Sequence, residues 1–373
     1  MRHIGLNMDT VKRSNRSSIL RLINNEGPIS KKDIAVRLSL TPAAVTQICS
    51  EFMESGLLVE RGVGDEEVIR AGRKKVLIDI APEYCYLYGI NIEPEYTRMA
   101  ICNLKGEALA CTEMKTRRGE APESFLMDVG AACETLRRDC KIAKEKLAGA
   151  GVGITGIVDK QKAQSLHAYG IWEKPVEVGT ILENCLQLPV RLENNVNAFA
   201  EAELIFGMGR QYDDLLLVKW GPGVGSSVII DNRIYEGTCG KAAELGHFIV
   251  DKDGALCSCG RHGCLETKVA VAALQRELPG FPEYIEDERA VPLTEAVDLL
   301  ARSIVNAATI LAPEKIVLYG SVLHNERIYR MLKCACEHYD EAFVGERICC
   351  STLAKMEGYI GPVAYFINEQ IFT

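Results

Sequence analysis

The pattern of apolar residues changes near residue 81, and this change requires at least two domains. Before it, segments with helical spacing alternate with turn residues and end in two short strands. After it, apolar runs typical of consecutive strands are followed by helices. At 373 residues the chain is also longer than most single domains. We therefore expect a small N-terminal domain over residues 1–80 and a larger α/β body that begins at residue 84.

Three short helices are predicted in the N-terminal domain. The first ends at Gly27-Pro28, which is a helix-stop signal. Ser30 can cap a second helix over residues 31–38, and Thr41 can cap a third over about residues 42–54. In the third helix, small and amide side chains lie opposite the apolar face. Two tightly joined helices of this kind are typical of a helix-turn-helix.

A pair of short strands follows the third helix and encloses a charged loop. The strands are predicted at residues 57–60 and 76–80, and the loop has a basic tip at residues 70–75. This hairpin predicts a wing that contacts phosphates or a minor groove, so the domain is predicted to be a winged helix-turn-helix. The side chains expected to contact DNA lie on the second helix, on the third helix and on the wing: Lys31, Ala43, Ala44, Thr46, Gln47, Arg70, Arg73 and Lys74.

The distribution of charge favours DNA as the partner of this domain. Residues 1–80 carry 13 Lys and Arg against 10 Asp and Glu, whereas the remaining residues carry 30 against 41. A mildly basic head on an acidic body fits a local nucleic-acid contact, because phosphate binding needs cations only where it occurs. The alternative is a protein-docking module with a solvated basic loop. A single winged helix offers few base contacts, so we expect a homodimer or higher homo-oligomer that reads two half-sites of operator DNA.

Composition argues against membrane insertion, export and a disulfide framework. No stretch approaches eighteen uninterrupted apolar residues, and the N-terminus lacks the apolar run of a signal peptide. We therefore expect a cytoplasmic protein with no membrane partner. Fifteen cysteines is a high and odd count, which favours free thiols and a metal site over a set of disulfides.

The body shows one plan twice, in which three consecutive strands precede a helix and a further strand. In the first copy the helix is predicted over about residues 124–147. Two β-β-β-α-β-α lobes of this kind would enclose a cleft, the usual place for a small molecule. The strands are predicted at residues 86–92, 98–102, 108–111 and 151–154, and at residues 215–218, 225–230, 233–235 and 315–319.

The sharpest local motif is one histidine and three cysteines within eighteen residues, namely His247, Cys257, Cys259 and Cys264. Thiolates and an imidazole at this spacing can form a tetrahedral Zn²⁺ site, and the glycines between them let the loop fold tightly around the ion. A site closed by four protein ligands is structural rather than hydrolytic. The alternative is a cysteine-rich loop without a metal.

The residues around this motif resemble the signature of the ROK family, which comprises repressors and sugar kinases. The resemblance lies in residues 237–247, Gly-Thr-Cys-Gly-Lys-Ala-Ala-Glu-Leu-Gly-His, and 257–266, Cys-Ser-Cys-Gly-Arg-His-Gly-Cys-Leu-Glu. Ala243 stands where the family usually has glycine, a conservative exchange. Repressors of the family carry a winged helix ahead of an actin-like, two-lobed α/β fold. The resemblance implies a first lobe at residues 84–198, rejoined by a C-terminal helix at 358–373, and a second lobe at 199–357 with the zinc loop.

The resemblance also implies a sugar site between the lobes. The residues that match the family's sugar contacts are Asn194, Glu244, His247 and Glu266, so that His247 serves both the metal and the sugar. We expect Asn195 to join them, because its amide offers a donor and an acceptor to sugar hydroxyls.

Two departures from the family's kinases predict that the chain is not an enzyme. Asn195 stands where their aspartate takes the proton from the attacking sugar hydroxyl, and a carboxamide is no useful base. Their first phosphate loop, Asp-x-Gly-Gly-Thr, is replaced at residues 91–97 by Asn-Ile-Glu-Pro-Glu-Tyr-Thr. Two carboxylates repel phosphate there, and the proline removes an amide donor.

These features together predict a sugar-responsive DNA-binding transcription regulator, a repressor, whose inactive kinase domain senses a sugar or sugar derivative. Two alternatives stay open. One is an active, ATP-dependent ROK sugar kinase. The other is an effector-independent DNA-binding protein with a vestigial cleft, against which the retained Asn194, Glu244 and Glu266 argue.

Overall fold

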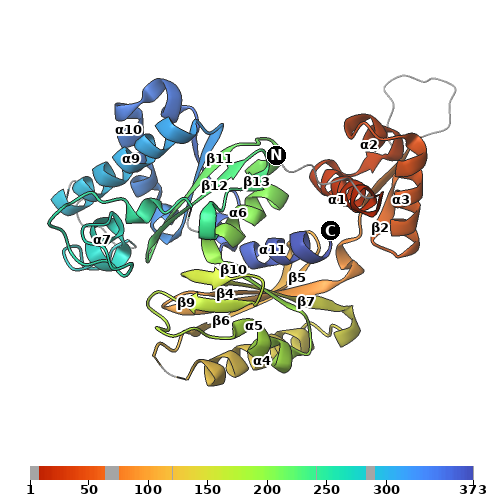
Figure 1. The fold of residues 1–373 in the computed structure, drawn as a ribbon, viewed down its shortest axis with the longest axis horizontal. Coiled ribbons are helices and arrows are strands. Elements are labelled where there is room, and N and C mark those ends of the chain that lie inside the picture. The colour runs from red at the N-terminus through yellow and green to blue at the C-terminus, as the bar shows by residue number, and fades with distance from the viewer. Residues whose placement is uncertain (1–7, 64–74, 120, 241, 283–289, 373) are drawn as a thin grey trace.

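The computed structural model describes residues 8–63, 75–119, 121–240, 242–282 and 290–372. A small helical head lies beside a two-lobed α/β body, with helices α6 (Asn195–Phe206) and α11 (Ile360–Gln370) between the two lobes (Figure 1). This architecture confirms the predicted fold class, a winged helix-turn-helix followed by a two-lobed actin-like fold. Across the described ranges, no helix has the length and apolar character needed to span a membrane.

The head consists of three helices and a three-stranded sheet of order β1-β3-β2. Local signals in the sequence set its helix boundaries. The Ser30 hydroxyl accepts a hydrogen bond from the Asp33 amide at 3.2 Å, and the Thr41 hydroxyl accepts one from the Ala44 amide at 3.3 Å. The elements are α1 (Met8–Glu26), β1 (Ile29–Ser30), α2 (Lys31–Arg37), α3 (Pro42–Glu54), β2 (Leu58–Val63) and β3 (Val76–Ile80).

The first lobe is a five-stranded sheet of order β10-β7-β4-β5-β6. Strands β4, β5 and β6 form an antiparallel meander. Strand β7 then pairs parallel with β4 on the other side of that strand. Helices α4 and α5 cover one face of this sheet, and α6 and α11 cover the other (Figure 1). The elements are β4 (Tyr86–Ile92), β5 (Tyr96–Asn103), β6 (Ala108–Lys115), α4 (Pro122–Asp139), β7 (Leu147–Ile154), β8 (Ile157–Asp159), β9 (Gln164–His167), α5 (Val178–Leu186) and β10 (Val190–Asn194).

The second lobe repeats this plan with a sheet of order β13-β12-β11-β14-β15. Strand β11 pairs antiparallel with β12 and parallel with β14. Helices α9 and α10 pack together, and the α9 side chains join the apolar core of this lobe. The elements are β11 (Leu215–Trp220), β12 (Val224–Ile230), β13 (Arg233–Ile234), α7 (Glu266–Val269), α8 (Val271–Leu274), α9 (Val291–Leu311), β14 (Lys315–Tyr319), α10 (Glu326–Tyr339) and β15 (Ile348–Cys350).

The predicted long helix over residues 124–147 is wrong in its second half. Helix α4 ends at Asp139, and Lys141 takes a left-handed backbone conformation with φ +56°. A residue in this conformation cannot continue a right-handed helix. The chain then turns, and Leu147 is already the first residue of β7.

The head is attached to the body by more than the chain connection. The side-chain amide of Asn24 in α1 donates to the Ile205 carbonyl of α6 at 2.8 Å. Arg210 donates in return to the Asn24 carbonyl at 2.8 Å, and Lys105 pairs with Asp79 of β3 at 2.8 Å. Apolar residues of the head and of both lobes also form one continuous cluster. The position of the head is therefore tied to helix α6.

Candidate ligand cleft and metal centre

A cleft of about 360 Å³ lies between the two lobes. In the first lobe its walls come from the segments that follow the carboxyl ends of β4, β7 and β10. In the second lobe they come from the β11–β12 turn and from the segment that carries the histidine of the Cys/His motif. All five residues expected to contact a sugar line it: Asn194, Asn195, Glu244, His247 and Glu266.

The first turn of α6 is fixed by two asparagines. The Asn194 side-chain oxygen caps the helix, accepting from the amides of Val196 at 2.8 Å and Asn197 at 3.2 Å. Its side-chain nitrogen donates to the Gly156 carbonyl at 2.7 Å. Asn194 therefore positions the helix, a task that the sequence did not predict, and has little hydrogen-bonding capacity left. Asn195 is buried, and its side-chain nitrogen donates to Glu93 Oε1 at 3.1 Å.

A buried cluster of charges joins the two lobes at the base of the cleft. Lys219 of β11 forms an ion pair with Glu93, which follows β4, and a second one with Glu357 at 2.7 Å. Arg98 lies on the outer side of Glu93, with Nη1 3.5 Å from Oε2. Burial favours the neutral forms, but the opposite charges lower the pKa of Glu93 and raise that of Lys219. The cluster is therefore charged at neutral pH.

This cluster corrects one expectation about the loop at residues 91–97. The sequence predicted that Glu93 and Glu95 would both present carboxylates to an approaching phosphate. Glu95 is exposed, but Glu93 is buried and paired with Lys219. Sequence reasoning missed the pair because its two members are 126 positions apart and no local pattern links them.

A second charged cluster bridges the lobes nearer the β8–β9 hairpin. Lys160 forms ion pairs with Glu193 of the first lobe and Glu236 of the second. Glu193 is almost fully buried, and burial raises the pKa of its carboxyl group. Lys160 therefore neutralises a carboxylate that could not stay charged there alone.

His247 lies between the cleft and the cysteine cluster. Its Nδ1 is 3.5 Å from Cys257 Sγ, and its Nε2 is 3.6 Å from Glu244 Oε2. The Tyr169 ring, which also lines the cleft, meets the imidazole edge to face with 6.3 Å between centroids. Burial, and then the charge of Arg261, lower the pKa of His247. A neutral imidazole is the form that binds a metal.

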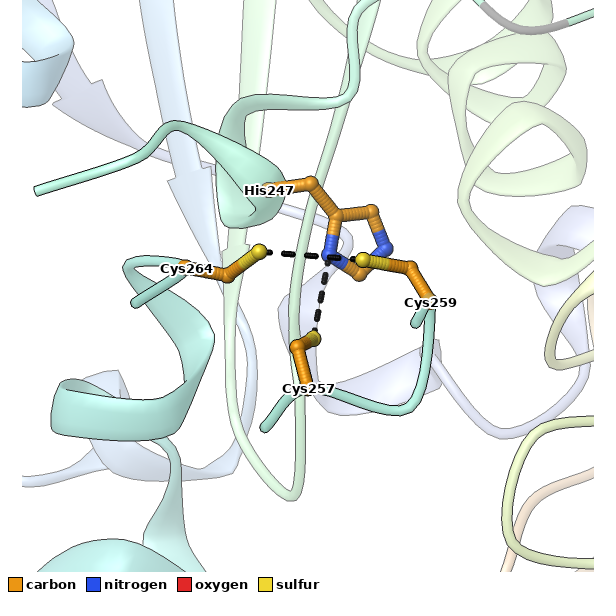
Figure 2. A group of neighbouring side chains, drawn as sticks. All are labelled: His247, Cys257, Cys259 and Cys264. Carbon is orange, nitrogen blue, oxygen red and sulfur yellow. Dashed lines mark hydrogen bonds between the residues drawn. The ribbon is translucent and has the colours of Figure 1, made fainter. Parts of the chain in front are cut away.

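The donor atoms of His247, Cys257, Cys259 and Cys264 converge on one point (Figure 2), and all lie within 4.8 Å of one another. The sulfurs of Cys259 and Cys264 are 3.7 Å apart. Sulfurs bound at about 2.3 Å to one tetrahedral Zn²⁺ would be roughly 3.8 Å apart. Burial opposes ionisation, but hydrogen bonds with Arg261 lower the pKa of the Cys259 thiol to about 7. The four side chains therefore fit a tetrahedral metal ion.

The backbone of the cysteine loop holds these donors in place. The Cys257 amide donates to the Arg261 carbonyl at 2.8 Å, and the Gly263 amide donates to the Ala255 carbonyl at 2.9 Å. Gly263 has φ +69°, and a Cβ there would lie 1.5 Å from the Asp251 carbonyl oxygen. Only glycine can occupy this position.

The segment that carries Glu244 and His247 is anchored to β12. The Leu245 amide donates to the Ser226 hydroxyl at 3.1 Å, and that hydroxyl donates to the Ala243 carbonyl. Ala243 has φ +59°, a left-handed conformation that costs a non-glycine residue about 1–2 kcal/mol. The exchange of glycine for alanine is therefore conservative in residue type but strained in backbone. Glu266 closes the same wall, and its Oε2 accepts from the Val224 amide at 3.0 Å.

The residues expected to contact DNA fall into three groups. Ala43, Thr46 and Gln47 are exposed on α3, and Ala44 is half-buried beside them. Lys31 is half-buried at the first position of α2. The wing residues Arg70, Arg73 and Lys74 lie outside the described part of the chain.

Comparison with known proteins identifies both parts of the chain. Residues 87–368 match the ROK family, and residues 13–59 match a winged helix-turn-helix DNA-binding model. A xylose repressor of Caldicellulosiruptor bescii is 27% identical over 302 residues, which cover 81% of this chain and 75% of that protein. The DNA-binding transcriptional dual regulator NagC of Escherichia coli is 25% identical over 348 residues, which cover 86% of this chain and 84% of that protein.

Solved structures agree in fold. A ROK family transcriptional regulator, described as a homologue of the Escherichia coli MLC protein, superposes with a TM-score of 0.77. It is 22% identical and covers 97% of this chain and 98% of its own. A ROK family glucokinase of Streptomyces griseus, in complex with glucose and AMPPNP, superposes with a TM-score of 0.62. It is 23% identical and covers 75% of this chain and 98% of its own. The chain belongs to the ROK family and carries a winged helix-turn-helix at its N-terminal end.

Proposed function

We propose that this protein is a transcription repressor that binds operator DNA through its head and responds to a sugar or sugar derivative bound between its lobes. The observation that carries the proposal is that helix α6 runs from the cleft to the head. Its first residue, Asn195, lines the cleft, and the carbonyl of Ile205 near its last residue accepts a hydrogen bond from Asn24 of the head. Twelve helical residues span about 18 Å. The relatives named as a xylose repressor and as the regulator NagC support both halves of the proposal.

The chemistry of the cleft suits a ligand rich in hydroxyl groups. Carboxylates of Glu244 and Glu266 accept hydrogen bonds, and Asn195 both donates and accepts. His247 Nε2 faces the same space, and the Tyr169 ring supplies an apolar surface. A cleft of about 360 Å³ falls in the range of about 300–1,000 Å³ usual for small-molecule sites.

The metal in this proposal is a structural Zn²⁺ ion held by His247, Cys257, Cys259 and Cys264. When bound, the ion supplies a rigid cross-link and no reactive position, because all four ligands come from the protein. The cross-link fixes the imidazole through Nδ1 and leaves Nε2 toward Glu244. The metal loop thereby orients one wall of the sugar site.

Ligand binding would change the affinity for DNA by changing the position of the lobes. A sugar that contacts both walls favours one arrangement of the lobes, and a rotation moves α6 and the head attached to it. The connection at residues 81–83 is short, and the Pro82 carbonyl accepts from the Leu104 amide of the first lobe at 3.1 Å. In a homodimer, the two recognition helices would then change their spacing. Coupling of this kind is typically worth about 1–3 kcal/mol.

The experiment that tests the function starts from operator DNA selected out of a random pool by the full-length protein. Fluorescence anisotropy then measures the affinity for that DNA while neutral monosaccharides are titrated one at a time. At least one sugar is expected to change the affinity about 5- to 150-fold. Strong operator binding with no response to any sugar or sugar derivative would favour the effector-independent alternative.

The competing function is ATP-dependent sugar phosphorylation, which the similarity in fold to a glucokinase favours. We expect ADP release with hexoses and amino sugars to stay at background, because Asn195 cannot act as a base and Glu93 occupies the first phosphate loop. Asn195→Asp is expected to stay inactive, since that loop is unchanged. A coupled ADP assay checks both proteins. Sugar-dependent turnover well above a no-sugar control would establish the kinase instead.

DNA recognition is expected to separate base-reading from phosphate-binding residues. Gln47→Ala should lower the preference for one base pair by about 1–3 kcal/mol. Lys31→Ala should instead weaken binding to all DNA sequences, and the slope of log K against log salt concentration should become smaller by about one. Anisotropy with single-base operator variants at several salt concentrations measures both effects. Gln161→Ala, at an exposed glutamine of the first lobe, is the matched control and should bind like the wild type. Unchanged base preference in Gln47→Ala would exclude this glutamine from base contact.

A further inference from the structure

Among the charged side chains that line the cleft, carboxylates outnumber cations. Among the described residues, six carboxylates face three cations. The carboxylates are Glu93, Glu95, Glu193, Glu236, Glu244 and Glu266, and the cations are Arg118, Lys160 and Lys219. A cleft with this balance disfavours an anionic ligand.

The buried Lys219 and the half-buried Lys160 already have two carboxylate partners each. Lys219 is paired with Glu93 and Glu357, and Lys160 is paired with Glu193 and Glu236. The third cation, Arg118, belongs to an exposed segment after β6. Among the described residues of the inner cleft, a phosphate group would therefore meet carboxylates without an unpaired lysine or arginine to neutralise it.

Glu93 contributes most to this effect because of its place. Its carboxylate lies where the lobes meet, bonded to Lys219 and to Asn195, and is buried away from water that could screen it. Like charges in a buried site repel more strongly than on the surface. Each neutral hydroxyl, in contrast, can donate a hydrogen bond to a carboxylate.

We propose that Glu93, together with the Lys219 and Glu357 cluster, makes the cleft selective for an uncharged sugar over the phosphate ester of the same sugar. This inference rests on the proposed sugar-binding function of the cleft and adds the class of ligand. Glu93 is in this view a specificity-determining residue. It takes the place of a phosphate-binding glycine and supplies the negative charge that excludes phosphate.

Isothermal titration calorimetry of the full-length protein tests the selectivity with matched pairs at pH 8, where the ester is a dianion. The pairs are glucose and glucose 6-phosphate, N-acetylglucosamine and its 6-phosphate, and xylose and its 5-phosphate. For each sugar that binds, the ester is expected to bind at least about 100-fold more weakly. An ester that binds as tightly as its sugar overturns the inference but leaves the sugar cleft standing. Binding of neither member of any pair overturns the sugar cleft itself and the inference with it.

Two substitutions separate charge from structure. Glu93→Gln keeps the shape of the side chain and removes its charge, so the ratio of ester affinity to neutral-sugar affinity should rise about tenfold. Glu357→Gln, outside the cleft lining, also releases charge on Lys219 and should act in the same direction, which keeps the test open if one variant does not fold. Glu123→Gln is the matched control, because Glu123 is exposed on α4 and neither lines the cleft nor belongs to the charged cluster. Equal loss of sugar and ester affinity in both test variants would give the cluster a structural role alone and overturn the inference.

Discussion

Replacing Cys264 by serine is expected to abolish binding of the proposed zinc ion and to weaken sugar binding at least about tenfold. The Cys264 side chain is fully buried, and its sulfur lies 3.7 Å from that of Cys259. A hydroxyl binds Zn²⁺ far more weakly than a thiolate, so three good ligands would remain where four are needed. Because the binding energy of a structural metal is folding energy, we expect the Tm to fall by roughly 5–10 °C.

The effect on sugar binding follows from the two faces of the His247 ring. His247 would hold the ion on the side of the ring that faces Cys257, and this bond would stop the ring from rotating away from Glu244. Without the ion, the ring and the loop at residues 257–264 gain freedom that sugar binding must then remove. Ligand-free operator binding should change little, because the polar contacts of the head with Ile205, Arg210 and Lys105 do not involve the metal loop.

Metal analysis of protein purified without chelators measures the first effect, and calorimetry with the cognate sugar measures the second. Near-stoichiometric zinc is expected in the wild type and a small fraction of that amount in Cys264→Ser. Cys334→Ser is the matched control, because Cys334 is exposed on α10 and outside the cluster. A metal-free wild type with a full sugar response would contradict the proposed site.

The head was predictable because its signals are local. Ser30 and Thr41 cap their helices through hydrogen bonds that span three residues, and the apolar face of α3 repeats at helical spacing. The helix over residues 124–147 was overextended for the opposite reason. Its end depends on the left-handed Lys141, and no glycine or proline marks that turn in the sequence. The predicted strand began at residue 151, whereas β7 begins at Leu147, because the small residues at 148–150 give no strand signal of their own.

The same distinction separates the parts of the candidate site. The cysteine cluster is compact in sequence, and its spacing alone predicted that the four side chains would meet. The Glu93, Lys219 and Glu357 cluster combines three distant segments, so only the packing of the lobes reveals it. Asn194 illustrates a third case. Its motif indicated a sugar contact, but the described hydrogen bonds show that it also caps α6 and holds Gly156.

Glu244→Ala is expected to lower sugar affinity at least about 100-fold and to abolish the effect of sugar on operator binding. Glu244 lines the cleft, and its Oε2 lies 3.6 Å from His247 Nε2. Each hydrogen bond from a sugar hydroxyl to a carboxylate is worth about 1.5–3 kcal/mol, and a carboxylate can accept two. Glu244→Gln keeps one hydrogen-bond acceptor in place, so its sugar affinity should fall only about tenfold. Glu277→Ala, at an exposed glutamate outside the cleft, is the control and should respond like the wild type.

The affinity of Glu244→Ala for operator DNA without sugar should equal that of the wild type, because Glu244 belongs to the second lobe and α6 with its contacts to Asn24 is intact. An operator titration with and without saturating sugar checks this. Coupling between two sites is reciprocal, so in the wild type operator DNA must change sugar affinity by the same factor that sugar changes DNA affinity. Calorimetry with and without operator measures that factor independently. A Glu244→Ala protein that still responds at the wild-type sugar concentration would place the effector outside this cleft. A factor that differs from one in the wild type, found from both sides, would show that cleft and head are thermodynamically linked.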